Sequence, residues 1–228
     1  MSERLVPSEG LGVLHLFCKA PPGTDPEAVV AALKAGRDDE QQVVCFSVLG
    51  HKADLGVMAV GPDWVQLRRL QSRLQGAGLE LSGSYVSLTE VSEYARASLD
   101  KQRSGPRLYP RLPPEGKRAI CFYPMSKRRE EGANWYTLDF DSRRELMNEH
   151  GVSGRRFSGR VLQLVTGSAG LDDYEWGVTL FAVHPDDLKD CVYTMRFDEA
   201  SARYADFGPF YAGIVGEVEE VVAELGLA

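Results

Sequence analysis

The chain of 228 residues is long enough for one large domain or two small ones. Hydrophobic residues make up 43% of it and charged residues 26%, which is ordinary for a globular protein and excludes disordered, collagen-like and disulfide-scaffold classes. Lysine and arginine number 26 against 33 aspartates and glutamates, so the formal net charge is −7. This acidic balance argues against general binding to nucleic acid or anionic membranes but leaves room for a local basic pocket.

Four cysteines are present, at Cys18, Cys45, Cys121 and Cys191, and they form no C-x-x-C pair. Their wide spacing indicates neither a zinc site nor a thioredoxin-like motif, and their apolar neighbours predict reduced, buried thiols. The first residues lack the apolar segment of a signal peptide, and no apolar run is long enough to span a bilayer. We therefore expect a cytoplasmic protein with no membrane span.

The first half alternates between strand-like and helix-like segments. Strands are expected over 12–18, 42–49, 55–60 and 84–93, and helices from residue 25 onward and over 63–75. The first helix opens with Asp25-Pro26-Glu27, which supplies an N-cap residue, a proline in the first turn and an early acid. The second carries apolar residues at helical spacing from Trp64 to Leu74.

Residues 100–118 differ in composition from the rest, with four prolines, two glycines and six basic residues. Proline and glycine at this density disfavour a helix or a central strand. We expect a linker or flap here, assigned to residues 106–117. It separates an N-terminal half over 1–105 from a C-terminal half over 118–228.

The second half repeats the pattern of the first. Strands are expected over 118–123, 160–166, 176–183 and 210–215, and helices over 141–150 and 186–196. In each half a strand runs into x-Pro-Asp, at Pro62-Asp63 and at Pro185-Asp186, where the aspartate is expected to cap the next helix. The shared order predicts an α+β fold in which a β-α-β-β-α-β, ferredoxin-like unit is used twice. Chance recurrence of a common turn is the competing interpretation.

A basic segment follows the linker. Residues 117–129 hold five basic residues and no acid. Strand alternation places Cys121, Tyr123, Met125 and Lys127 on one side of it. On an acidic protein this segment suits carboxylates or phosphates, and a solvated strand end is the simpler alternative.

Histidine is scarce, with four residues in the chain. His15 lies in an apolar strand and is expected in the core, whereas His51 and His184 lie in turns. His150 is expected as the last residue of a helix that Gly151 ends, where the negative helix end favours a charged imidazole. It is either a helix cap or a metal ligand. Motifs for zinc proteases, phosphate loops and serine hydrolases are absent from the sequence, so a metal held by one histidine points to haem, whose porphyrin supplies four ligands.

Five longer motifs resemble the coproheme decarboxylases, a branch of the chlorite-dismutase-like haem protein family. They are YPMSKRR (123–129), NWY (134–136), ELMNEHG (145–151), TGSAGLDDYEWGVTLFA (166–182) and YTMRFDEASARYADFGPFY (193–211), and GHKADLG (50–56) agrees with the family's N-terminal half. The resemblance implies a dimeric α+β barrel built from two ferredoxin-like repeats. It also implies a homopentamer, and haem in the C-terminal half alone.

By this resemblance His150 is the axial ligand of the haem iron, and Tyr123 is the catalytic tyrosine that becomes a radical. Lys127 is the second catalytic residue and attends a reactive propionate, and Met125 contacts the porphyrin edge. The implied reaction uses hydrogen peroxide to decarboxylate two propionates of Fe-coproporphyrin III (coproheme) to vinyl groups. Its product is haem b, so the implied role is in haem biosynthesis.

The resemblance also assigns residues around the porphyrin. Gln163 takes the distal position, as in the Firmicute-type branch, and Arg196 and Ser201 bind propionates. The actinobacterial branch has a distal histidine, for which His51 is an alternative. Arg107 and Arg111 of the flap are further candidates for substrate contact, but their alignment is left open.

Three other functions compete with this one. A chlorite dismutase or haem peroxidase is disfavoured by Gln163, because chlorite dismutases carry a distal arginine. A non-catalytic haem-binding protein is disfavoured by the presence of Tyr123 and Lys127. A barrel of the same type without haem is the third alternative.

Overall fold

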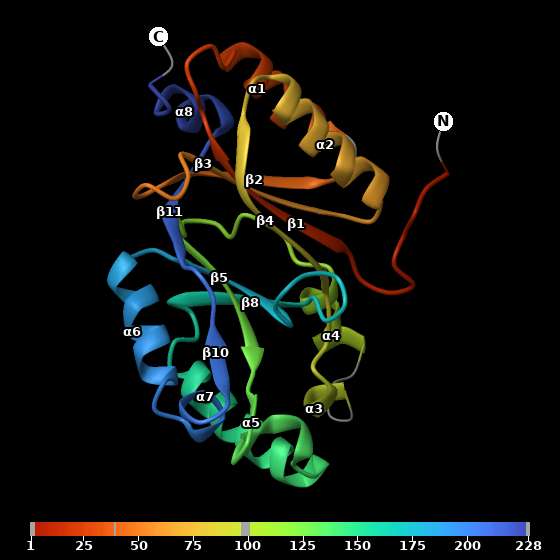
Figure 1. The fold of residues 1–228 in the computed structure, drawn as a ribbon, viewed down its shortest axis with the longest axis vertical. Coiled ribbons are helices and arrows are strands. Elements are labelled where there is room, and N and C mark those ends of the chain that lie inside the picture. The colour runs from red at the N-terminus through yellow and green to blue at the C-terminus, as the bar shows by residue number, and fades with distance from the viewer. Residues whose placement is uncertain (1–2, 39, 97–100, 227–228) are drawn as a thin grey trace.

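Two successive β-α-β-β-α-β units form the fold, described for residues 3–38, 40–96 and 101–226 in a computed structural model (Figure 1). The first unit consists of β1 (Gly12–Lys19), α1 (Pro26–Asp38), β2 (Gln42–Val48), β3 (Leu55–Gly61), α2 (Trp64–Gly76) and β4 (Glu80–Thr89). The second consists of β5 (Ala119–Lys127), α5 (Phe140–Arg155), β8 (Val161–Gly167), β9 (Trp176–Ala182), α6 (Pro185–Met195) and β11 (Tyr211–Gly216).

Short elements fill the connections. They are α3 (Glu93–Arg96), α4 (Lys101–Leu108), β6 (Arg129–Glu130), β7 (Ala133–Asn134), the 3-10 helix Trp135–Thr137, α7 (Glu199–Ala202), β10 (Ala205–Phe207) and α8 (Val218–Ala223). No helix in the described ranges is long and apolar enough to cross a bilayer.

Nine of the strands pair into one antiparallel sheet in the order β10-β5-β11-β2-β3-β1-β4-β8-β9, and a further pairing of β5 with β9 closes it, while β6 and β7 pair separately. The first half contributes β2-β3-β1-β4, and the second contributes β8-β9-β5-β11 in the equivalent order. The halves join at β4–β8 and β11–β2. This topology confirms the predicted α+β architecture of two ferredoxin-like repeats in a dimeric α+β barrel.

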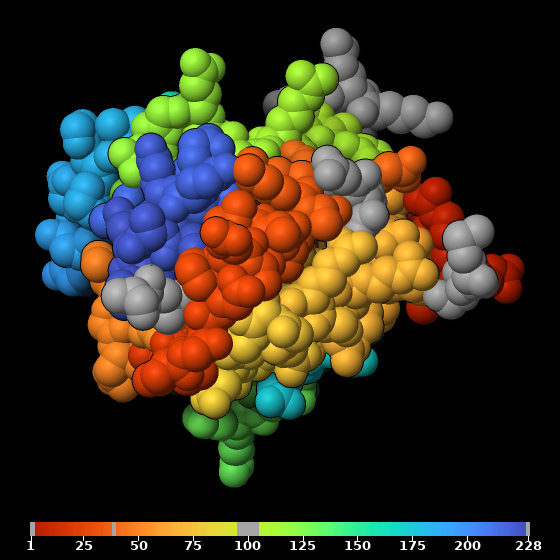
Figure 2. Space-filling view, turned by 90° about the horizontal axis from the view of Figure 1, so that it is seen from above, coloured from red at the N-terminus to blue at the C-terminus, as the bar shows by residue number. Residues whose placement is uncertain are grey.

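Alternation along each strand divides the core in two. In β1, Leu14 and Leu16 pack outward against helices, while Val13 and Phe17 pack inside the barrel. Helices α1, α2 and α8 cover the first half, and α5, α6 and α7 lie on the second (Figure 1). Figure 2 shows the C-terminal segment against the surface formed by the first half, so the chain end crosses between the repeats.

The expected caps agree with the structure in the first half only. Asp63 is the N-cap of α2, and its side chain accepts a hydrogen bond from the Val65 backbone N–H. In the second half the N-cap of α6 is His184, without a side-chain hydrogen bond, and Asp186 lies inside the helix. The prediction for Asp186 is wrong because Pro185 takes the first helical position, which moves the cap one residue back.

Helix α5 corrects a second prediction. It begins after the N-cap Asp139, one residue before the expected start at residue 141, and it runs through Gly151 to Arg155. His150 therefore lies inside the helix, and the argument from a negative helix end does not hold. Glycine in a helix costs about 1 kcal/mol relative to alanine, which is a penalty that packing can offset.

The linker contains a helix that the composition argues against. Helix α4 spans Lys101–Leu108 and includes Pro106. Its C-terminal end is held in place because Leu108 is buried and its carbonyl accepts a hydrogen bond from the Thr89 hydroxyl. Beyond it, Gln42 bonds the backbone of Pro110 and Leu112, which anchors this part of the predicted flap to the start of β2.

Candidate functional site

Strand β5 carries the first part of the site and is longer than expected, reaching Lys127. Ile120 and Phe122 pack inside the barrel, whereas Cys121 and Tyr123 pack in the outer core of the second half, with Met125 against that core. The predicted shared side is thus confirmed for Cys121, Tyr123 and Met125. It faces α6 and the segment from α7 to β11.

Tyr123 is buried in an aromatic cluster. Its ring centroid lies 4.5 Å from that of Phe210, in a stacked arrangement, and 5.7 Å from that of Phe207. Burial raises the pKa of Tyr123 well above its ordinary value, although Arg196 acts in the opposite direction. The phenol is therefore protonated at neutral pH, and its conversion to a neutral radical requires loss of both a proton and an electron.

Lys127 is also buried. Its Nζ donates a hydrogen bond of 2.7 Å to the Ala200 carbonyl and lies 4.1 Å from the centroid of the Trp135 ring. Burial lowers the pKa of Lys127 to about 8, and the charges of Asp198 and Glu175 oppose this shift. Lys127 can therefore act as an anion-binding cation and also exchange a proton close to neutral pH.

His150 projects from α5 toward α7. Its Nδ1 lies 3.0 Å from Oδ2 of Asp198 and 3.3 Å from Oγ of Ser201. Because an ionised carboxylate only accepts, Nδ1 carries the proton, and the lone pair of Nε2 is left for a ligand. Burial raises the pKa of Asp198, but hydrogen bonds from His150 and Ser201 outweigh this and hold it below its ordinary value. The arrangement fits an axial ligand of haem iron.

Gln163 lies on the outer side of β8, near α5 and α6. Its Nε2 donates to Sγ of Cys191 at 3.5 Å. A Cβ added at Gly154 of α5 would lie 3.5 Å from the same Nε2. Gln163 therefore approaches α5, the helix that carries His150, at Gly154, which lies one helical turn beyond His150.

Arg196 and Ser201 line one cavity of about 500 Å³, together with Phe207 and Phe210. The guanidinium carbon of Arg196 lies 4.7 Å from the centroid of the Phe207 ring. Met125 is half-buried and pairs in register with Phe207 on β10. The Tyr123 cluster and the predicted propionate-binding residues are thus joined through these two phenylalanines.

Comparisons with known proteins identify the family of the chain. The sequence model of the family described as Chlorite dismutase matches residues 25–216. The chain belongs to the chlorite dismutase family.

Relatives within this family include proteins named coproheme decarboxylase. The chain is 43% identical to that of Staphylococcus carnosus over 193 residues, which cover 80% of this chain and 77% of the relative. It is 45% identical to that of Staphylococcus saprophyticus over 175 residues, covering 74% and 70%. These relatives confirm the resemblance seen in the motifs.

Other relatives bear different names. A Natronomonas pharaonis protein named for heme binding is 44% identical over 214 residues, which cover 87% of this chain but only 35% of that protein. A structure of a novel heme-binding protein from Thermus thermophilus has a TM-score of 0.83 at 38% identity, with 96% of both chains covered. A mutant chlorite dismutase of Candidatus Nitrospira defluvii has a TM-score of 0.77 at 18% identity, with 96% of this chain and 97% of that one covered, and shows the shared fold.

Three predicted candidates lie in other places. His51 is exposed in the turn between β2 and β3. Arg107 lies in α4 and Arg111 just after it, and both are exposed. Their part in substrate binding stays a prediction.

Sequence reasoning missed two residues of the site, Asp198 and Trp135. Asp198 caps α7 by accepting a hydrogen bond of 2.9 Å from the Ser201 N–H, and it also orients His150. The spacing Asp-x-x-Ser is a recognisable cap pattern, so the α7 helix could have been foreseen. The link to His150 could not, because the two residues are 48 positions apart.

Proposed function

We propose that the chain binds Fe-coproporphyrin III through His150 and uses hydrogen peroxide to decarboxylate two of its propionates, giving haem b. The observation that carries this proposal is the Asp198–His150 hydrogen bond, which prepares Nε2 as a ligand. Tyr123 and Lys127 lie on the strand that packs toward α6 and α7. The two staphylococcal relatives named coproheme decarboxylase support the same activity.

The residues of the second half account for the requirements of this reaction. When bound, the iron porphyrin supplies one-electron oxidation with peroxide as the oxidant. Each propionate loses carbon dioxide, one proton and two electrons as it becomes a vinyl group, and reduction of one peroxide to two waters takes up the two electrons. Tyr123 loses one electron and one proton to become a neutral radical, which then takes a hydrogen atom from the propionate β-carbon. The second electron leaves the substrate as carbon dioxide departs, and the peroxide takes up both electrons.

The remaining residues bind and orient the substrate. Lys127 pairs with a reactive carboxylate and exchanges a proton with it, and Met125 contacts the porphyrin edge. Arg196 and Ser201 hold a propionate, for which a guanidinium is suited by its fixed fork of donors. Gln163 lies on the distal side, where it offers hydrogen bonds without adding a charge.

Mass spectrometry tests the activity directly. Purified protein is loaded with coproheme under anaerobic conditions and titrated with hydrogen peroxide. We expect two successive losses, each of carbon dioxide and two hydrogen atoms relative to the propionic acid form, with a three-propionate intermediate between them. A porphyrin that keeps its mass at all peroxide levels would contradict the proposal.

Replacement of Tyr123 by phenylalanine separates binding from chemistry. Tyr123→Phe keeps the stacked ring but cannot form the radical, so we expect coproheme binding, read from the Soret band, to remain within about threefold. Decarboxylation should fall at least about a hundredfold, if the tyrosine carries the electron transfer. Tyr193→Phe is the control, because Tyr193 is exposed on α6 and its ring packs against Phe197. Full activity of Tyr123→Phe would remove Tyr123 from this role.

Haem binding without turnover is the second candidate. The names of the Natronomonas and Thermus proteins favour it, since both refer to heme binding. It predicts a Soret band that is lost in His150→Ala, together with an unchanged porphyrin mass after peroxide. Oxygen release on adding chlorite would instead support a chlorite dismutase.

We further propose that residues 118–228 form the haem-binding half, that residues 1–105 form the structural half, and that 106–117 connect them. Four buried free cysteines agree with a cytoplasmic protein. The family resemblance also supports a homopentamer, and exposed apolar side chains, among them Leu49, Val183 and Ile214, offer surface for self-assembly. Native mass spectrometry measures the number of subunits.

A further inference from the structure

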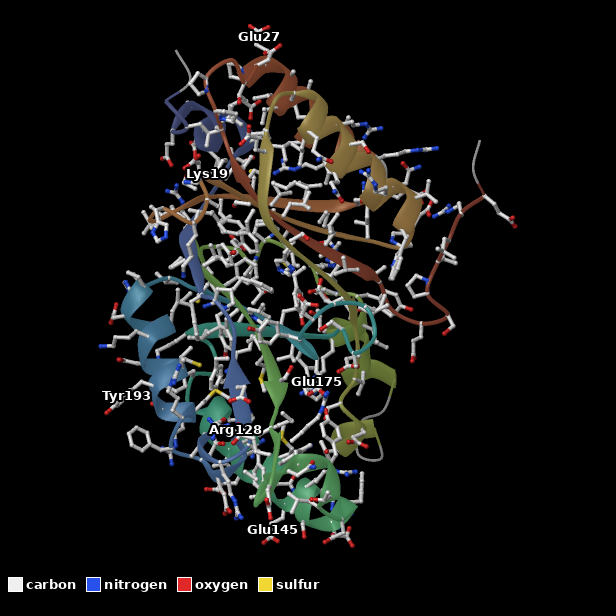
Figure 3. All side chains as sticks on the ribbon, in the orientation of Figure 1. Lys19, Glu27, Arg128, Glu145, Glu175 and Tyr193 are labelled. Atoms are coloured by element: carbon white, nitrogen blue, oxygen red, sulfur yellow. The ribbon has the colours of Figure 1, made fainter. Side chains whose placement is uncertain are left out.

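Glu175 carries a buried carboxylate to which the proposed function gives no part. It is the last residue before β9, and its side chain is 8% exposed. Its backbone N–H donates a hydrogen bond of 3.1 Å to the Met125 carbonyl, and its carbonyl accepts one of 2.8 Å from the Ser168 N–H. Figure 3 shows Glu175 between the loop that precedes β9 and strand β5. The residue thus closes the loop over 168–175 and places an acid beside the end of β5.

Three donors converge on the Glu175 carboxylate. Oε2 accepts a hydrogen bond of 2.8 Å from the Lys127 backbone N–H, and Oε1 accepts one from Nη2 of Arg129. The Tyr136 phenol is the third partner, and its ring centroid lies 5.4 Å from the guanidinium carbon of Arg129. A buried carboxylate is tolerated when donors compensate its charge in this way. The cluster therefore fixes the backbone of β5 at the residue that is proposed to pair with a reactive carboxylate.

The Lys127 ammonium faces two carboxylates without pairing with either in the part of the chain that the structure describes. The hydrogen bond of its Nζ goes to a backbone carbonyl, whereas Asp198 bonds His150 and Glu175 bonds its own cluster. Burial lowers the pKa of Lys127 to about 8, and the charges of Asp198 at the start of α7 and of Glu175 before β9 oppose this shift. Both carboxylates thus favour the ammonium form and leave its protons for a substrate carboxylate.

Glu175 exerts this effect more specifically than Asp198 does. Asp198 is engaged with His150, whereas Glu175 contacts the backbone of Lys127 itself. The counter-charge of Arg129 does not cancel that of Glu175, because the Arg129 side chain is 67% exposed and screened by solvent while Glu175 is buried. The pair of Glu175 and Arg129 therefore leaves a net negative field at Lys127.

We propose that Glu175 is the positioning residue of Lys127: its carboxylate holds the end of β5 and keeps Lys127 in the ammonium form that binds a substrate carboxylate. This rests on the proposed decarboxylation and adds one residue to it. The competing explanation is that Glu175 only anchors the loop over 168–175, which would affect stability and leave the protonation of Lys127 unchanged.

The titration of Lys127 can be measured on the full chain without substrate. The chain is labelled with ¹³C-lysine, and the Lys127 resonance is identified by its absence in Lys127→Met. Glu175→Gln keeps an amide oxygen for the Lys127 N–H but removes the charge, so the midpoint of the Lys127 titration should fall by about 0.5–1 pH unit. A structural anchor predicts no change in this midpoint.

Two further variants separate the charge of Glu175 from its contacts. Arg129→Gln breaks the same ion pair but keeps the Glu175 charge, so the Lys127 midpoint should not fall. Glu175→Asp keeps the charge on a shorter side chain that reaches the backbone less well. Its midpoint should stay within about 0.3 pH unit of that of the unchanged chain, even where its melting temperature falls. An equal fall in Glu175→Gln and in either of these variants would overturn the assignment.

The pH dependence of the second loss of carbon dioxide connects this charge to the reaction. A lower midpoint means that Lys127 loses its proton at lower pH, so the alkaline limb of the rate profile of Glu175→Gln should move down in pH by the same amount. An unchanged Lys127 midpoint in Glu175→Gln, or a lowered midpoint with an unmoved limb, overturns the assignment. If the unchanged protein does not decarboxylate coproheme at any pH, the proposed function fails instead, and the effect of Glu175 on the Lys127 titration is still measured.

Discussion

At the scale of single residues, the barrel interior contains the imidazole ring of His15, whose burial has a measurable cost in the free energy of unfolding. His15 is fully buried, with Nε2 at 3.0 Å from Oγ1 of Thr179 and its ring stacked at 4.1 Å on Phe122. Its Nδ1 has no hydrogen-bond partner among the residues that the structure describes. Burial lowers the pKa of His15 to about 3, so the imidazole stays neutral in the folded protein.

This burial predicts a dependence of stability on acid. An unfolded chain takes up a proton at His15 below pH ~6.5, and the folded protein does so only near pH 3, so acidification across this window favours unfolding. His15 should contribute up to about 1.4 kcal/mol per pH unit to the loss of unfolding free energy. Urea unfolding between pH 7 and pH 4 should show a smaller loss for His15→Gln than for the unchanged chain. His184→Gln is the control, and equal pH slopes in all three proteins would contradict the prediction.

At the scale of elements, helix α5 contains two glycines close to His150. A Cβ at Gly151 would meet only the flexible end of Arg155, at 3.3 Å. A Cβ at Gly154 would lie 3.5 Å from Gln163 Nε2 and 3.7 Å from Met195 Cε. Both positions are helical, but only Gly154 lies where the helix approaches Gln163, the residue proposed for the distal side of the haem site.

Two alanine substitutions should therefore separate helix stability from haem binding. Gly151→Ala and Gly154→Ala should each raise the unfolding free energy by about 0.5–1 kcal/mol, because alanine is the better helix former. Only Gly154→Ala should weaken coproheme binding, by about tenfold or more, since its methyl group occupies space between the helix and Gln163. Thermal unfolding and Soret titration measure the two effects. Equal affinities of both variants would show that the porphyrin does not approach this point.

The elements also show what the sequence could and could not predict. The strand alternation that groups Tyr123 with Cys121 and Met125 and the cap at Asp63 depend on neighbours a few residues away, and both predictions are confirmed. Helix α5 was expected to end at Gly151 because glycine is a local stop, but tertiary packing decides its end. Asp198 and His150 meet through such packing, and local patterns do not contain this information.

For the molecule as a whole, closure of the barrel makes the two repeats depend on each other. Val13, Phe17 and Phe46 of the first half pack in one interior cluster with Phe122 and Phe181 of the second. Neither half alone would bury these rings, so the boundary between halves is not a boundary between independent cores. The proposed haem-binding half, residues 118–228, is therefore expected to need residues 1–105 in order to fold.

The seam between β11 and β2 gives the means to test this dependence. Gly213 pairs with Val48, and a Cβ at Gly213 would collide with the backbone carbonyl oxygen of Ser47 and lie 2.8 Å from Cδ2 of Phe46. Because a backbone atom cannot turn aside as a side chain does, Gly213→Ala should lower the unfolding free energy by about 2–3 kcal/mol.

The effect of Gly213→Ala should extend through both repeats. Hydrogen exchange followed by mass spectrometry should show equal loss of protection in peptides from β3, in the first half, and β9, in the second, because the interior cluster unfolds as one unit. Gly76→Ala is the control, since a Cβ there meets nothing within 4 Å. Loss confined to the second half would mean that the repeats unfold separately, and that residues 118–228 could hold the haem site alone.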